Sequence, residues 1–562
     1  LRLLVDDDNV KKALATSLNT LRRVLNVVDW LTVTKGNPEA WLYFYEDFLE
    51  VYDNALRKKT GSYYTPPQVV EAMVRLTDEV LRDPELFGRS RGLADPTVTI
   101  CDPAVGTGTF LLGILNRIAK TVEADQGAGA VGPAIEAALE RIIGFELQFG
   151  PFAVAQLRIM AEMQSLVGED VTVKTPQLYI TDTLGDPFAA ETQFSALVAP
   201  IGESRKQANK IKREIPITVV IGNPPYKERA RGRGGWIENG SDTNKKLTAP
   251  MDRWVPPTEW GVGAHVKHLK NLYVYFWRWA TLKVFGSGWY AATGQPEQDR
   301  SGVVCFITVA GFLNGPGFQK MREDLRRDCA AIWVIDCSPE GYRPDVNARI
   351  FQDVQQPVCI VLAARTPGKD RRKPAKLKFM SLPGGHREKV KFPALAKLSI
   401  NSDGWLDGPC DWREPFLPNQ DGAWSSFPAL TDIFEYNGSG VMPGRTWIIA
   451  PDSQSLTQRW ARLINEKDLR TKETLFHPHL RKGKPGDKHI HKAISRCLAG
   501  YPGSKLPIAK ETVSQVAPIR YSFRTFDRQW IIPDARVINQ PNPMLWDSYS
   551  QWQVFLTVPE DR

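Results

Sequence analysis

A short apolar run that ends in a glycine-rich turn constrains the fold of this chain more than any other feature. Residues 97–101 (T-V-T-I-C) are typical of a buried strand, residues 102–109 (D-P-A-V-G-T-G-T) of a turn, and residues 110–118 of an apolar helix. Gly106 and Gly108 let the backbone approach a ligand closely, because no Cβ intervenes. This order predicts a nucleotide pocket in a doubly wound α/β sheet.

The residues around the glycines narrow the kind of ligand. The turn lacks the third glycine of the dinucleotide-binding pattern and has no Walker lysine, so we do not expect it to cradle phosphates. Asp102, which precedes the glycines, suits a ligand that carries a positive amino group. The alternative is an ordinary tight strand-to-helix turn without a ligand.

Acidic residues end the next two predicted strands. Residues 141–145 lead to Glu146, and residues 178–180 lead to Asp182 and Thr183. An acid that ends the second strand can accept both hydroxyls of a ribose, and a carboxylate after the third strand can accept from an adenine amine. Each acid alone would more often be a solvated loop or helix-cap residue. Their places at successive strand ends favour a shared nucleoside-binding edge.

A tetrapeptide, Asn223-Pro224-Pro225-Tyr226, follows the apolar run of residues 218–222. Its asparagine offers an amide oxygen that can accept from an exocyclic amine. Its prolines stiffen the loop so that carbonyls can point into a pocket, and its tyrosine offers a flat face to a planar ring. The residue types predict methyl transfer to a ring amine, whereas a proline-rich structural loop is the alternative.

The motifs G-x-Y-Y-T-P, D-P-A-x-G-T-G-T-F, G-F-E, D-T-L and N-P-P-Y, in this order, resemble those of a known family. The family is the γ arrangement of amino-methyltransferases, which are S-adenosylmethionine-dependent DNA adenine-N6 methyltransferases with a C-terminal target-recognition region. The resemblance implies S-adenosylmethionine as cofactor, double-stranded DNA as partner, and flipping of the target base out of the duplex.

The resemblance also implies roles for individual residues. Tyr64, Thr65 and Pro66 would border the methionine moiety; Asp102, Pro103, Ala104, Gly106 and Gly108 would form the cofactor loop; Glu146 would bind the ribose, and Asp182 with Thr183 the cofactor adenine; Asn223, Pro224 and Pro225 would hold the target amine, with Tyr226 stacked on the base. Independently of the family, Thr65 is expected to cap a helix that begins near Pro66 and Pro67.

Two further segments, residues 41–61 and 521–530, resemble Type ISP restriction–modification enzymes, which join nuclease, translocase, methyltransferase and recognition parts in one polypeptide. We found no Walker lysine motif and no clear nuclease motif, and therefore expect a fragment or a relative without the motor. Nuclease and translocase partners would then belong to a longer polypeptide or to separate subunits. The alternatives are a stand-alone methyltransferase of another phage-defence system, an N-P-P-Y enzyme acting on RNA or protein glutamine, and a non-catalytic DNA-binding module.

Charge and composition suggest three parts. Residues 366–562 carry 30 Lys and Arg against 20 Asp and Glu, whereas the rest of the chain is nearly balanced, as expected if DNA is held behind the catalytic region. We predict a helical spacer at 1–60, a methyltransferase domain at 61–365 and a mixed α/β target-recognition domain at 366–562. The Gly- and Arg-rich residues 227–263 should form a long loop inserted in the methyltransferase domain.

Later apolar runs, near residues 302–308, 331–335 and 357–362, complete a doubly wound, mostly parallel sheet that we expect to end in an antiparallel edge. No long uncharged apolar run predicts a membrane span or a secretory signal. The seven cysteines show no C-x-x-C spacing, and the paired histidines near 477 and 489 have no cysteine partners, so we expect no metal site. A cytoplasmic enzyme fits this composition.

Overall fold

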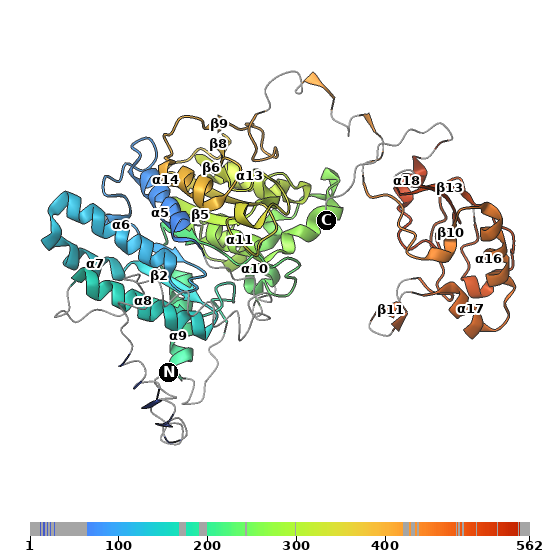
Figure 1. The fold of residues 1–562 in the computed structure, drawn as a ribbon, viewed down its shortest axis with the longest axis horizontal. Helices are drawn as coiled ribbons and strands as arrows, with labels where there is room; N and C mark the ends of the chain where they lie inside the picture. The colour runs from blue at the N-terminus through green and yellow to red at the C-terminus, as the bar shows by residue number, and fades with distance from the viewer. Residues whose placement is uncertain are drawn as a thin grey trace. The chain divides into compact units, whose positions relative to one another are not determined.

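The computed structural model describes residues 65–167, 176–189, 199–241, 244, 246–297, 299–419 and most of 426–550, together with a few positions between residues 12 and 27. Tyr64 and nearly all of the predicted spacer at 1–60 lie outside this description. The chain divides into two compact units, with the boundary between Asn419 and Gln420 (Figure 1).

The first unit is built on one nine-stranded mixed sheet, in the order β3-β2-β1-β4-β5-β7-β6-β8-β9. Its strands are β1 (Ile100–Asp102), β2 (Ile142–Glu146), β3 (Gln177–Ile180), β4 (Val219–Gly222), β5 (Gly302–Val309), β6 (Ala331–Asp336), β7 (Val358–Arg365), β8 (Lys376–Ser381) and β9 (Leu406–Asp407). Strands β1 to β5 pair in parallel, and the strand order reverses between β1 and β4. In open α/β sheets such a reversal is where ligands bind, beyond the carboxyl ends of the strands.

Helices surround this sheet (Figure 1). They are α5 (Pro67–Arg82), α6 (Thr109–Gln126), α7 (Val131–Leu139), α8 (Phe149–Val167), α9 (Ala199–Glu214), α10 (Gly235–Asn239), α11 (Leu272–Phe285), α12 (Trp289–Thr293), α13 (Gln319–Asp328) and α14 (Phe392–Lys397). Every residue of β5 and of β7 is buried, as expected for strands covered on both faces. The α/β fold class is therefore confirmed.

One detail of the sheet differs from the expectation. The sheet does end in an antiparallel strand, but the long strand β7 is antiparallel as well and lies inside the sheet, between β5 and β6. Strand β8 continues the sheet beyond β6 in parallel, and the short β9 ends it in antiparallel pairing. The first unit consequently extends to Asn419, past the boundary that we placed at residues 365 and 366.

The inserted segment at residues 227–263 is a second difference. It contains α10 and two short 3-10 helices, Pro250–Trp254 and Thr258–Trp260. Trp236 and Trp254 are buried in the core of the unit. The Gly- and Arg-rich composition suggested a long loop, but two large aromatic side chains hold the segment against the rest of the unit.

The second unit has its own small core and mixed secondary structure. A three-stranded antiparallel sheet has the order β10 (Ile449–Ala450), β14 (Asp527–Ile531) and β13 (Ile519–Arg524), and β11 (Leu480–Arg481) pairs with β12 (Lys484–Pro485). Its helices are α16 (Ser453–Asn465), α17 (Leu469–Phe476) and α18 (Pro543–Asp547). The predicted mixed α/β character of the C-terminal region is confirmed. Within the described parts of both units, no helix has the length and apolar character needed to span a bilayer.

Candidate active site

Asp102 ends β1 and is fully buried. Its Oδ1 accepts a hydrogen bond from the backbone N–H of Ala104 at 3.0 Å, whereas Oδ2 has no hydrogen-bond partner among the described residues. Burial raises the pKa of this carboxyl to about 7; the bond from Ala104 opposes this shift, and the nearby carboxylate of Glu146 adds to it. A buried acceptor of this kind is suited to a cationic ligand group.

The glycine turn that follows Asp102 is open where a ligand would approach. Gly106 has a φ of +56°, and a Cβ added there would meet nothing within 4 Å. Its N–H donates to Oε2 of Glu146 at 2.9 Å, and Oε1 of Glu146 accepts from the N–H of Gln148 at 2.7 Å. Gly108, with a φ of +88°, precedes α6, and a Cβ there would lie 3.2 Å from Cβ of Ala155. The sequence thus places glycines where space and backbone conformation require them.

The segment after β3 is fastened to the Asp102 turn. The hydroxyl of Thr183 donates to the carbonyl of Pro103 at 2.6 Å. Oδ1 of Asp182 accepts from the N–H of Leu184 at 3.0 Å, and the Asp182 side chain remains exposed. Two of the predicted cofactor segments are therefore in direct contact.

Lys212 on α9 is a residue of this site that sequence reasoning missed. Its Nζ donates to the carbonyl of Asp182 at 2.6 Å and to the hydroxyl of Thr181 at 3.1 Å. Burial lowers the pKa of this lysine to about 8, although the carboxylate of Asp182 opposes the shift. Nothing distinguishes Lys212 from the other basic residues of its helix in the sequence, so no signal pointed to it.

Asn223 follows β4 directly, and its Nδ2 donates to the hydroxyl of Thr65 at 3.0 Å. The prediction that Thr65 caps a helix is wrong. Helix α5 begins at Pro67 with Pro66 as its N-cap residue, and no side chain forms a cap hydrogen bond. Thr65 lies one residue too early, and its hydroxyl accepts from Asn223 instead.

The loops after β1 and β4 meet closely. A Cβ on Gly222, the last residue of β4, would lie only 2.7 Å from Oδ1 of Asp102. Glycine at this position therefore allows the aspartate turn and the Asn223 loop to lie side by side at the reversal of the strand order. Sequence reasoning treated Gly222 only as the end of a strand.

Tyr226 is packed rather than open. It is buried, its hydroxyl donates to the carbonyl of Ile307 at 3.1 Å, and its ring meets that of Phe351 edge-on at 5.8 Å between centroids. Pro224 is buried and Pro225 is partly exposed beside it. The structure thus brings together the predicted site residues that it describes, from Thr65 and Pro66 to the tetrapeptide.

Among the described residues no group of three or more His, Cys, Asp and Glu side chains could hold a metal ion.

Two family models match the chain. The model described as N-6 DNA Methylase matches residues 42–252, and the model described as Type ISP C-terminal specificity domain matches residues 432–562. No curated protein sequence is similar enough to count as a match.

Solved structures show the same fold. The cryoEM structure of a DrdV–DNA complex has a TM-score of 0.56 at 20% identity, covering 95% of this chain and 49% of that chain. A nuclease-deletion mutant of the Type ISP restriction-modification enzyme LlaGI, in complex with a DNA substrate mimic, has a TM-score of 0.56 at 18% identity, covering 85% and 38%. The ATP-dependent Type ISP enzyme LlaBIII bound to DNA has a TM-score of 0.52 at 20% identity, covering 73% and 27%.

The chain spans about half or less of the length of these proteins. The likeness to the DrdV structure covers nearly the whole chain, and the two family models match one segment in each unit. The chain therefore contains an N-6 DNA methylase domain followed by a Type ISP C-terminal specificity domain.

Proposed function

We propose that this chain transfers a methyl group from S-adenosylmethionine to N6 of adenine in duplex DNA, at a sequence chosen by its C-terminal domain. The observation that carries the proposal is the contact between the Asn223 loop and the Asp102 turn at the ends of β4 and β1. One loop offers acceptors to an amine, and the other offers a buried carboxylate to a cation. The match to the N-6 DNA methylase model supports this pairing.

The residues of the turn fit S-adenosylmethionine. The buried Oδ2 of Asp102 is an acceptor for the amino group of the methionine moiety, and the open face of Gly106 leaves room for the ligand. Glu146 accepts from the N–H groups of Gly106 and Gln148, and its remaining lone-pair capacity would accept from a ribose hydroxyl. Asp182 and Thr183 would lie at the adenine. The cofactor supplies a methyl group activated by its sulfonium charge.

The chain's own residues would act on the target amine. The lone pair of adenine N6 is delocalised into the ring, so the amine is a poor nucleophile. The two N–H groups of this amine would donate hydrogen bonds to Oδ1 of Asn223 and to the carbonyl of Pro224. These acceptors would localise the lone pair on the nitrogen and stabilise the positive charge that develops during attack. The base must first leave the duplex, at a cost of a few kcal/mol, and its contacts in the pocket would offset part of this cost.

The partner proposals follow from the specificity domain. The basic excess of residues 366–562 would hold double-stranded DNA, and the likeness to Type ISP enzymes supports a role in a restriction–modification system of the cytoplasm. Nuclease and translocase modules, in the same longer polypeptide or in separate subunits, would complete such a system.

The test is methyl transfer from labelled S-adenosylmethionine to unmodified duplex DNA, followed by nucleoside analysis. We expect N6-methyladenine at one defined sequence. Label that enters RNA or a protein glutamine, with none in DNA, would overturn the proposal.

Asn223→Ala should lower kcat by at least about 100-fold, because an acceptor that stabilises the developing charge is lost. Binding to DNA should be retained, as measured by gel shift. A matched control is Asn239→Ala, an exposed asparagine on α10 whose amide donates to the carbonyl of Gly235 in its own helix. Loss of DNA binding together with activity in Asn223→Ala would contradict the assigned role.

A further inference from the structure

The bond between Thr65 and Asn223 joins two motifs that lie 158 residues apart in the sequence. Thr65 is 6% exposed, and its hydroxyl takes no part in capping α5. The family resemblance assigns the Tyr-Thr-Pro segment to the cofactor, yet in the structure this hydroxyl contacts the side chain proposed to hold the target base. The contact therefore points to a role on the other side of the site.

We infer that Thr65 is a positioning residue for the methyl transfer, acting by holding the carboxamide of Asn223 in a fixed plane. This inference rests on the proposed function of Asn223. With Nδ2 turned toward Thr65, Oδ1 is the end of the amide that is directed away from Thr65 and presented to an incoming amine. Thr65 itself touches neither the methyl group nor the target nitrogen in this scheme.

An asparagine amide needs such a partner, since its last side-chain torsion has a broad, roughly two-fold energy profile. Rotation about this bond turns Oδ1 away from the target amine or puts the NH₂ group of the amide in its place. Two NH₂ groups are both donors, so they repel each other. One hydrogen bond to Nδ2 at 3.0 Å removes most of this freedom. Acceptors that are fixed before the reaction pay no reorganisation during it.

Thr65 is well placed to hold the amide because it is itself rigid. Threonine is β-branched, so its χ1 angle is restricted. The two prolines that follow have fixed φ angles, and the N–H groups of Val69 and Val70 bond back to the carbonyl of Pro66. Val69 and Val70 are buried in the core. The hydroxyl is thus carried by the start of a packed helix and not by a free loop.

The experiment compares Thr65→Val with Thr65→Ser. Valine keeps the shape of the side chain and removes the hydroxyl, whereas serine keeps the hydroxyl. We expect Thr65→Val to lower kcat by up to about 100-fold, because a small misplacement of a reacting group is costly. The Kd for S-adenosylmethionine should remain near that of the wild type, and Thr65→Ser should recover most of kcat.

The matched control is Thr77→Val, within helix α5, which begins two residues after Thr65. Thr77 is fully buried, and its hydroxyl donates to the carbonyl of Met73 within α5 and also forms a hydrogen bond with the thiol of Cys305. This variant should keep kcat and cofactor Kd, which separates loss of one buried hydroxyl in α5 from loss of the contact with Asn223.

Three outcomes decide the inference. A loss of kcat in Thr65→Val that serine rescues, at unchanged cofactor Kd, supports it. Weaker cofactor binding at unchanged kcat would overturn it and assign Thr65 to the methionine moiety. If Thr65→Val kept the wild-type kcat and the wild-type Kd for S-adenosylmethionine, the inference would also be overturned. If wild type and Thr77→Val form no N6-methyladenine while binding S-adenosylmethionine, the proposed function itself has failed, which is a distinguishable result.

Discussion

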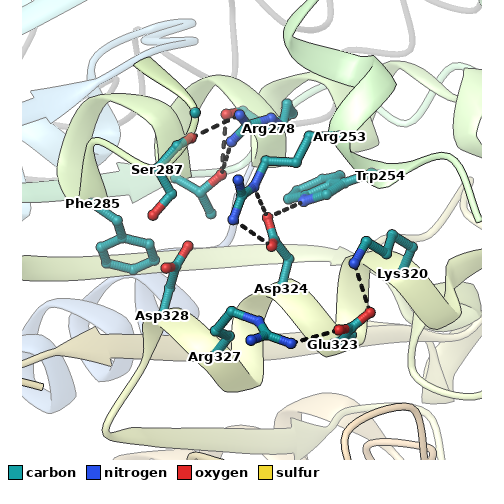
Figure 2. Close-up of polar contacts among 12 residues, drawn as sticks. Arg253, Trp254, Arg278, Phe285, Ser287, Lys320, Glu323, Asp324, Arg327 and Asp328 are labelled. Carbon is teal, nitrogen blue, oxygen red and sulfur yellow. Dashed lines mark hydrogen bonds and ion pairs between the residues drawn. The ribbon is translucent and has the colours of Figure 1, made fainter. Parts of the chain in front are cut away.

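Asp102 at the end of β1 and Asp324 on α13 are both buried, at 0% and 4% exposure, but their surroundings differ. Asp324 accepts from Nε and from the terminal Nη2 of Arg253, at 2.6 and 2.7 Å, and from Nε1 of Trp254 at 3.1 Å (Figure 2). Asp102 accepts one backbone N–H. The charge of Asp324 is compensated by Arg253, so this carboxylate holds the inserted segment in place. Asp102 has no such cation and is therefore suited to receive a cationic ligand.

Glu323, the neighbour of Asp324 on α13, is also compensated by cations (Figure 2), whereas Oδ1 of the buried Asp328 has no hydrogen-bond partner among the described residues and lies 3.5 Å from Nε of Arg371. Glu323 pairs with Lys320 and with Arg327, each at 2.7 Å. Partial burial would raise the pKa of Glu323, but the bonds from these two cations outweigh it and lower that pKa. Asp324 is thus paired with a cation of the inserted segment, and Glu323 with two cations of α13. Asp102 is not compensated in this way where the proposed cofactor binds, and the following predictions test that contrast.

Asp102→Asn should give the largest effect, with opposite signs on stability and on cofactor binding. Burial raises the pKa of Asp102 from 3.8 to about 7, so between these values the folded protein keeps a proton that the unfolded chain releases. The free energy of unfolding therefore falls as pH rises through this window, by up to about 4 kcal/mol. The asparagine variant lacks this fall, and its stability relative to the wild type should increase from pH 4 to pH 8.

Urea unfolding of both proteins without cofactor, across this pH range, measures the difference directly. Calorimetric titration at pH 8 should show weaker binding of S-adenosylmethionine to the variant, since the acceptor for the amino group has lost its charge. Parallel pH profiles for the two proteins would show that Asp102 is compensated after all.

Asp324→Asn should have the reverse outcome, with stability lost and cofactor affinity kept. It removes the charge that faces Arg253 and leaves an incompletely paired guanidinium. Because the Arg253 side chain is 34% exposed and water can reach it, we expect a loss of about 2–3 kcal/mol, less than for a fully buried pair. Denaturant unfolding tests this, with the exposed neighbour Asp252→Asn as a control that should leave stability unchanged. If Asp324→Asn kept full stability but lost cofactor affinity, Asp324 would belong to the cofactor site, and the contrast with Asp102 would be wrong.

The same contrast explains what the sequence could predict. The residues at strand ends carry their chemistry in their type and order, so the motifs around Asp102, Glu146, Asp182 and Asn223 are enough to predict a site there. The contacts that fix those residues join distant positions, as in the bonds from Asn223 to Thr65 and from Lys212 to Asp182. No local pattern marks such pairs, because they exist only once the sheet has formed.

The domain boundary failed for a related reason. Residues 369–378 form a basic cluster within the region 366–562 that we assigned to DNA binding. In β8, Leu377 and Phe379 face the core, while Lys376 is exposed and Lys378 partly exposed. Alternation of buried apolar and exposed charged residues is typical of a strand with one solvated face. We gave weight to the charged residues and did not recognise the strand. The inserted segment was misjudged similarly, because glycines and arginines outnumber the tryptophans that anchor it.

Two buried arginines of α13 show how a buried cation is stabilised, as the two aspartates do for a buried anion. Arg322 and Arg326 are 2% and 0% exposed, and within the described residues their guanidinium groups bond only to backbone carbonyls. Those of Arg326 belong to the 409–416 segment, and the guanidinium also lies over the ring of Phe416. Burial lowers the pKa of each arginine to about 10, so both remain charged near neutral pH. Carbonyl dipoles here replace a counter-ion in fastening the last segment of the first unit.

Arg326→Met should have the smallest effect on global stability and a clear local one. Methionine fills much of the space, and the released carbonyls of the 409–416 segment can turn to water, so we expect a loss of about 1–2 kcal/mol. Hydrogen exchange at the amide of Phe416, which donates to the carbonyl of Leu313, should accelerate more than exchange in β5. Arg326→Lys keeps the charge but reaches fewer carbonyls, and should lie between methionine and wild type. Unchanged exchange in Arg326→Met would mean that aromatic packing of Phe416 alone fastens the segment, and that buried charge on α13 serves only the inserted segment at Arg253.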